Sequence, residues 1–275
     1  MFWDPYALPA FIVGLLLYYV GHRLFILTPA GKKRWGMGIL LAILCLPALS
    51  FNLYYAHLAI EPWWYVIFRS VSGIETLAAC WGMFWGFACT RITSGQASII
   101  RVACHTIALT CTVLFIAVPF LKPIMNPVEE YHHLKNRWKG NVCLQTSGST
   151  CGPASMATIF AFYGMTKNER EIAEACYTSY TGTELWYLLR YAKQHGLQIT
   201  YLQPCRLPDI PAPALLGTTA ILSDGPVQSG HFITLLGKMG NGYIIADPEN
   251  GSRVLTEDQF IHIYGRLCNA ISFTK

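Results

Sequence analysis

A cysteine in the C-terminal half of the chain stands where a catalytic thiol would be expected. Cys151 lies in NVCLQTSGSTCGPASMATIFAFYG, residues 141–164, just ahead of an apolar helical pattern that Pro153 opens. A thiol attacks as its thiolate, and both a helix N-terminus and a neighbouring imidazole favour that anion. The alternative interpretation is a buried thiol, since the chain has ten cysteines. Further residues must decide between the two.

Three polar residues elsewhere complete the set that thiol catalysis requires. His231 begins the strand-like run HFITLLG, and Asp247 closes the next one, GYIIADP. If the two runs pair as a hairpin, these side chains lie side by side, and the carboxylate can hold the imidazole in the correct tautomer. Gln145 precedes Cys151 by six residues, so its amide and the Cys151 backbone N–H can serve as oxyanion donors. The sequence therefore predicts a Cys151–His231–Asp247 triad assisted by Gln145.

These residues belong to a segment with the pattern of a small α+β domain, residues 141–275. A helix from Pro153 to Tyr163 ends at a glycine, and TELWYLLRYAKQHG is a further helix. The segments TKNE, 166–169, and TEDQ, 256–259, are typical of capping boxes. Strand-like runs follow the helices: LQITYL, ALLGTTAIL, HFITLLG, GYIIADP and NAISF. We expect a largely antiparallel sheet with helices on one side.

The N-terminal half has the composition of a membrane domain. The chain is 53% hydrophobic and 13% charged, with a mean hydropathy of +0.36. Residues 1–140 carry 11 basic and 5 acidic side chains, whereas residues 141–275 carry 9 and 10. Four stretches are long enough to cross a bilayer. The sequence predicts a four-helix transmembrane domain over residues 1–125 and a linker over 126–140, with spans at about Ala7–Leu27, Met37–His57, Trp64–Cys89 and Val102–Leu121.

Basic residues in the short loops favour one orientation of this domain. Six of them lie in the first and third connections, against four after the fourth span. Because Lys and Arg accumulate on the cytoplasmic side, the N-terminus and the catalytic domain are expected outside the cytoplasm. We predict an integral protein of a bacterial inner or plasma membrane, with the lipid bilayer as one partner.

Several other ionisable or thiol groups have no role assigned by the sequence. Glu75 lies within the third predicted span and Arg69 nearer its outer end, where function, packing or snorkelling are all open. Besides Cys151, four cysteines of the soluble half could form two disulfides or be core thiols: Cys143, Cys176, Cys205 and Cys268.

The motif set resembles the bacteriocin-processing, double-glycine-type cysteine peptidases, a papain-like family. The resemblance runs over residues 143–268 and includes QTSGSTCGPASMATIFAFYG, GTELWYLLRYAKQHGLQI, GHFITLLG, YIIADPENG and LTEDQFIHIYG. It implies a papain-like fold, Cys151 as nucleophile, His231 as base and acid, Asp247 as its orienting group, and Gln145 in the oxyanion hole. It also implies a peptide substrate cleaved after Gly-Gly.

The chain departs from the familiar members in the order of its parts and in the expected side of its peptidase. There the peptidase is the N-terminal, cytoplasmic part of an ATP-driven exporter, whereas here the predicted spans come first, which leaves a separate transporter open as a partner. Two other functions use the same residues: acyl or amide transfer on the triad, and peptide binding without catalysis. We predict no cofactor and no metal, and the soluble half has no basic face for a nucleic acid.

Overall fold

The structure is a computed structural model of residues 1–275, and it describes residues 4–58, 62–125, 128, 133–202, 206–219, 230–265 and 267–275. The chain forms two compact units. The first comprises Met1–Pro62 and Val71–Met125, and the second comprises Trp63–Ser70 and Asn126–Lys275. The chain therefore leaves the first unit for eight residues and then returns to it.

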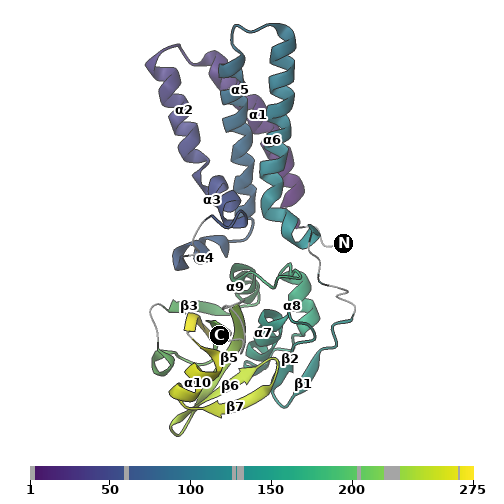
Figure 1. The fold of residues 1–275 in the computed structure, drawn as a ribbon, viewed down its shortest axis with the longest axis vertical. Coiled ribbons are helices and arrows are strands. Elements are labelled where there is room, and N and C mark those ends of the chain that lie inside the picture. Colours follow the sequence, from purple (N-terminus) through teal and green to yellow (C-terminus); the bar gives the residue numbers. More distant parts are fainter. Residues whose placement is uncertain are drawn as a thin grey trace. The chain divides into compact units, whose positions relative to one another are not determined.

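The first unit is helical (Figure 1). Its elements are α1 (Ala7–Leu27), α2 (Lys32–Leu44), α3 (Leu46–Tyr55), the 3₁₀ helix η1 (Ile74–Ala79), α5 (Cys80–Thr93) and α6 (Ser98–Met125). By length and composition α1 and α6 can each cross a membrane, and α2 with α3 forms a pair bent by 48° that can act as a third span.

The second and third predicted spans are thus interrupted. The bend after α2 precedes Pro47 in the first turn of α3, where a proline lacks its N–H and disfavours helical backbone before it. The third stretch divides into α4 (Trp63–Arg69), η1 and α5. Gly73 caps η1 with a φ of 74°, a left-handed conformation that a glycine adopts without strain. Of this stretch, α4 lies in the second unit.

Glycines allow α1 and α5 to pack with their backbones in contact. Gly82 and Gly86 form a G-x-x-x-G motif on α5, and a Cβ at Gly86 would overlap the backbone oxygen of Tyr18 on α1. A Cβ at Gly82 would likewise overlap the oxygen of Gly14. Small residues at this spacing are common where two membrane helices pack closely, because they let the two backbones approach each other.

The second unit is an α+β domain with an antiparallel sheet, as predicted. The sheet order is β3-β8-β4-β5-β6-β7, and every neighbouring pair is antiparallel. Its strands are β3 (Gln198–Leu202), β4 (Ala214–Thr219), β5 (Gly230–Met239), β6 (Gly242–Asp247), β7 (Gly251–Leu255) and β8 (Leu267–Thr274). A separate hairpin pairs β1 (Arg137–Lys139) with β2 (Val142–Leu144).

Helices cover both faces of this sheet, so the expectation of helices on one side is wrong. The remaining elements are α7 (Cys151–Phe162), α8 (Glu169–Ala175), α9 (Leu185–Gln194), η3 (Leu207–Asp209) and α10 (Glu257–Tyr264). On β5, Thr234 donates to the Ser155 carbonyl of α7 at 3.2 Å, whereas its neighbour Ile233 packs in the core cluster that contains Phe260 of α10. Alternate residues of a strand point to opposite faces, so each face requires its own cover.

The helix caps follow the sequence with one shift. Thr256 and Gln259 form the predicted capping box of α10. At α8 the capping side chain is Asn168, which accepts from the Glu171 N–H at 2.8 Å, rather than Thr166.

The α1–α5 contact leads to a test with a matched control. Gly86→Ala should lower the thermal unfolding midpoint of the detergent-solubilised protein by several degrees, because the new methyl group meets backbone that cannot move aside. Gly36→Ala, on α2 with nothing within 4 Å of its built Cβ, should leave the midpoint unchanged or raise it. Equal midpoints for the two variants would contradict this packing.

Candidate active site

The thiol of Cys151 lies at the first residue of α7. Thr150 precedes the helix and is fully buried, and its hydroxyl donates to the Ser147 carbonyl at 3.0 Å. Cys151 itself is 8% exposed. The first N–H groups of a helix have no intrahelical partner, so the Cys151 N–H is free to serve a ligand, and the helix terminus favours negative charge beside it.

A side chain at the residue after Cys151 would be crowded. A Cβ on Gly152 would lie 2.9 Å from Leu188 Cδ1, 3.3 Å from Phe232 Cδ2 and 3.6 Å from Thr183 Cβ. Leu188 belongs to α9 and Phe232 to β5, so the start of α7 is held between these two elements. In the Cys-Gly-Pro motif, the glycine is therefore favoured because it has no side chain, and the proline because it lies in the first turn of the helix.

The predicted hairpin is present and brings His231 to Asp247. β5 and β6 are antiparallel neighbours, and the His231 Nε2 lies 3.1 Å from Asp247 Oδ1. The His231 side chain is 15% exposed and that of Asp247 is 3% exposed. The carboxylate holds Nε2, which leaves Nδ1 as the ring nitrogen available to the sulfur.

Three further donors fix the Asp247 carboxylate. The Glu249 N–H donates to Oδ1 at 2.9 Å, and Asn250 Nδ2 and the Tyr264 hydroxyl each donate to Oδ2 at 2.8 Å. Sequence reasoning assigned no role to Asn250 or Tyr264. The first was visible as the Asp-Pro-Glu-Asn turn, which favours a local Asx contact. The second comes from α10 and had no local signal.

Burial and hydrogen bonding act in opposite directions on these groups. Burial lowers the pKa of His231, but hydrogen bonds to Asp247 and Cys151, and the negative charges of both, raise it to about 10. Burial raises the pKa of Asp247, but His231, Asn250, the Glu249 N–H and Tyr264 together hold it well below its usual range. An imidazolium paired with the Asp247 carboxylate is therefore the state that this arrangement stabilises.

Gln145 lies in the loop that leads to Cys151, and its side-chain amide contacts this loop and the turn that follows β6. The backbone N–H of Gln145 donates to the Pro248 carbonyl at 2.8 Å, so it is not available to a substrate. The side-chain Nε2 donates to Ser147 O at 3.0 Å and to Glu249 Oε1 at 3.4 Å, whereas the buried Oε1 has no hydrogen-bond partner among the residues that the structure describes. The oxyanion role of Gln145 remains a prediction that requires the amide to turn.

The other cysteines of this unit do not share the environment of Cys151. Cys143 and Cys176 are buried free thiols, Cys268 is exposed, and Cys205 lies outside the described residues. Burial, assisted by the charge of Glu169, raises the pKa of Cys143 to about 12. Burial also raises the pKa of Cys176. Thiols of this kind are inert.

His231, Asp247 and Glu249 could in principle surround a metal ion, since one ligand atom from each lies within 4.8 Å of the others. Both oxygens of Asp247 already accept two hydrogen bonds each. We therefore assign the cluster to imidazole orientation rather than to metal binding.

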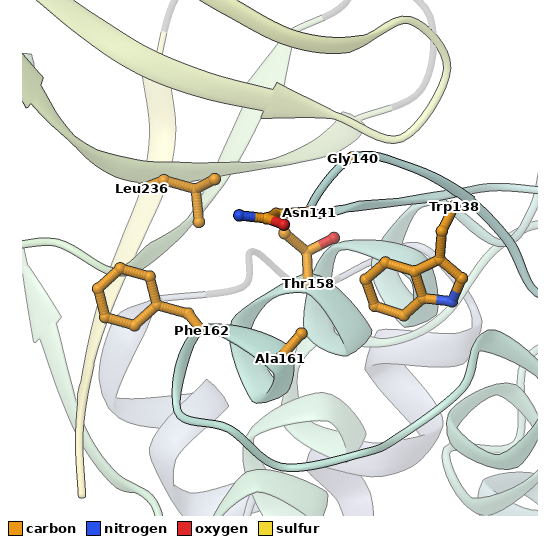
Figure 2. Close-up of a pocket in the computed structure, with 7 residues that line it drawn as sticks. All are labelled: Trp138, Gly140, Asn141, Thr158, Ala161, Phe162 and Leu236. Atoms are coloured by element: carbon orange, nitrogen blue, oxygen red, sulfur yellow. The ribbon is translucent and has the colours of Figure 1, made fainter.

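A pocket lies at the other end of α7 (Figure 2). Its volume is about 390 Å³, and it is lined by Trp138, Gly140, Asn141, Thr158, Ala161, Phe162 and Leu236. Leu236 lies at the register shift of β5, between Leu235 and Gly237. The α7 residues that line this pocket begin at Thr158 and end at Phe162, so roughly 10 to 17 Å of helix separates it from Cys151.

Comparisons with known proteins agree on the kind of domain. Residues 139–272 match the model of the Peptidase C39 family. No curated protein matches the chain.

Several solved structures resemble about half of the chain. The peptidase domain of Streptococcus ComA, a bifunctional ABC transporter involved in quorum sensing, is 21% identical, with a TM-score of 0.41, over 48% of this chain and 96% of that one. A double glycine motif protease from an AMS/PCAT transporter, in complex with its leader peptide, is 22% identical, with a TM-score of 0.41, over 50% and 94%. The peptidase domain of Streptococcus mutans ComA is 19% identical, with a TM-score of 0.37, over 49% and 99%.

The family match covers the segment that carries Cys151, His231 and Asp247. The chain is a cysteine peptidase whose residues 139–272 are similar to the Peptidase C39 family.

Proposed function

We propose that this chain is a membrane-anchored cysteine peptidase that removes a leader from a peptide, after Gly-Gly, by Cys151–His231–Asp247 catalysis. The observation that carries the proposal is the His231 ring, which Asp247 holds through Nε2 at 3.1 Å and whose pKa the neighbouring Cys151 side chain helps to raise. The similarity of the domain to double-glycine leader proteases supports the substrate class.

The proposed reaction has two halves. The Cys151 sulfur, as thiolate, attacks the scissile carbonyl carbon, and the oxyanion of the tetrahedral intermediate is held by the Cys151 N–H and by the Gln145 amide once it has turned. His231 gives its proton to the leaving amine, and the C–N bond breaks to leave a thioester. A water molecule then loses a proton to His231 and attacks the thioester carbonyl. The C–S bond breaks, its electron pair returns to the sulfur as thiolate, and the new carboxylic acid is released. Asp247 keeps the ring oriented throughout.

Two observations support a membrane anchor of four crossings. Trp63–Ser70 and Asn126–Lys275 belong to one compact unit, and a compact folded unit lies on one side of a bilayer. The chain between them must then cross an even number of times, so α6 requires a second crossing within residues 71–97. η1 and α5 supply it: six 3₁₀ residues and fourteen α-helical residues span about 33 Å, against a hydrocarbon core of about 30 Å.

With α1 and the α2–α3 pair as the other crossings, the basic loops favour a peptidase unit outside the cytoplasm. A transporter partner would then be a separate chain.

Acyl or amide transfer is the second candidate. Transfer and hydrolysis share the thioester intermediate and differ only in the acceptor that attacks it. The residues of the site therefore favour neither reaction over the other. Peptide binding without catalysis is weaker, because a purely binding groove has no need of a carboxylate held by four donors behind an imidazole.

One test of the proposed function concerns Cys151 as the nucleophile. Cys151→Ala should reduce cleavage of a Gly-Gly leader peptide by more than about 1,000-fold without altering the thermal unfolding midpoint. Cys268→Ala removes an exposed thiol from β8 and should cleave as the wild type does.

Mass spectrometry of the products in H₂¹⁸O completes that test. Hydrolysis places one ¹⁸O in the new carboxylate, whereas a new amide bond without ¹⁸O would establish transfer. Cleavage by Cys151→Ala at the wild-type rate would overturn the proposal.

Another test concerns the side of the membrane on which the peptidase unit lies. In sealed cells, a membrane-impermeant maleimide should label Asp209→Cys, in η3, from outside, and should label Gln96→Cys, between α5 and α6, only after permeabilisation. A background lacking the exposed Cys268 and peptide mapping of the labelled site keep the assignment specific. Labelling of both positions from the same side would exclude a crossing by α6 between them.

A further inference from the structure

The helix α4 packs on α9 within the peptidase unit. The Arg69 guanidinium carbon lies 4.2 Å from the centroid of the Trp186 ring, and Arg69 Nη1 donates to the Tyr65 hydroxyl at 3.1 Å. Arg69 and Trp186 are both 0% exposed. The sequence left snorkelling open for Arg69, but its side chain is instead stacked on an aromatic face, a geometry that suits the planar guanidinium.

Two side chains of α9 bind the end of α4. Arg190 Nη2 donates to the Arg69 carbonyl at 2.7 Å, and Lys193 Nζ donates to Ser70 Oγ at 2.8 Å. The last carbonyls of a helix have no intrahelical partner, and cations stabilise that end. The α4–α9 contact therefore combines the stacking of Arg69 on Trp186 with hydrogen bonds from α9 to the C-terminal end of α4.

The same helix α9 holds the nucleophile. Leu188, two residues after Trp186, is the nearest neighbour of the position that a Cβ on Gly152 would take, and Thr183, just before α9, is close to it as well. One turn of α9 thus contacts Arg69 with one side chain and the residue after Cys151 with another.

We propose that Arg69 and Trp186 are positioning residues for the peptidase reaction: α4 holds the first turn of α9 against the start of α7 and so keeps the Cys151 sulfur facing His231. This inference rests on the proposed function. It assigns the task to a segment, Trp63–Ser70, that lies outside the residues matching the family and, in the sequence, between helices of the first unit. Catalysis in this chain then depends on a segment from the N-terminal half of the sequence.

Displacement of α9 acts on geometry rather than on substrate affinity. A misplacement of about 1 Å transmitted from outside the reacting groups can lower turnover by about 100-fold. We therefore expect Arg69→Met and Trp186→Leu to lower kcat by roughly 10- to 100-fold while KM stays within about two-fold of wild type. Trp186→Phe keeps an aromatic face for the guanidinium and should restore most of the turnover.

The experiment uses the full chain in detergent micelles. It measures kcat and KM on the Gly-Gly peptide, and separately the rate at which iodoacetamide alkylates Cys151, followed by peptide mapping. Arg206→Met, which removes an exposed arginine paired with Asp209 at 3.2 Å, is the matched control and should behave as wild type. Thermal unfolding establishes that each variant is folded. Should Trp186→Leu not fold, Arg69→Met and Trp186→Phe carry the comparison.

The outcomes separate this inference from the proposed function. Slower Cys151 alkylation in folded Arg69→Met and Trp186→Leu, with near wild-type alkylation in Trp186→Phe, supports the positioning role. This holds even if no form cleaves a Gly-Gly peptide. In that case only the proposed function fails. Wild-type kcat and wild-type alkylation in folded Arg69→Met and Trp186→Leu overturn the inference while leaving the proposed function intact.

Discussion

The carboxylate of Asp247 is the constraint on which the rest of the peptidase unit depends. It is 2% exposed, and a charge at such depth is costly unless it is hydrogen-bonded on all sides. Its four donors come from three places: His231 on β5, the turn at 249–250, and Tyr264 at the end of α10. The sheet hairpin, the turn and the covering helix are therefore assembled around one anion, and the imidazole is oriented as a consequence.

The same interaction ties stability to pH in two directions. The pKa of His231 is raised from 6.5 to about 10, so its contribution to the free energy of unfolding is complete below pH 6.5 and is lost as the pH rises towards 10. The pKa of Asp247 is lowered from 3.8, so its contribution is complete above that pH and is lost on acidification below it. Both are complete between about pH 4 and 6.5, and the imidazolium remains the major form at neutral pH.

Local patterns were sufficient to predict the helix at Cys151 and the hairpin that joins His231 to Asp247, because both depend on residues near in sequence. Tyr264 and Arg69 could not be predicted in the same way, since each depends on a contact made by the folded chain. Trp63–Arg69 is as apolar as the helices around it, so hydropathy assigned it to a membrane span, although its partner Trp186 lies in the soluble half. The third span was predicted as one helix for the same reason.

The protonation state of the His231 ring tests the account most directly. NMR of the full chain with ring-labelled histidine, assigned by His231→Gln, would follow that imidazole from pH 5 to 11. We expect an imidazolium through neutral pH, with a midpoint near 10 that falls by more than one unit in Asp247→Asn. A neutral ring with a midpoint near its ordinary 6.5, unchanged by Asp247→Asn, would contradict the account.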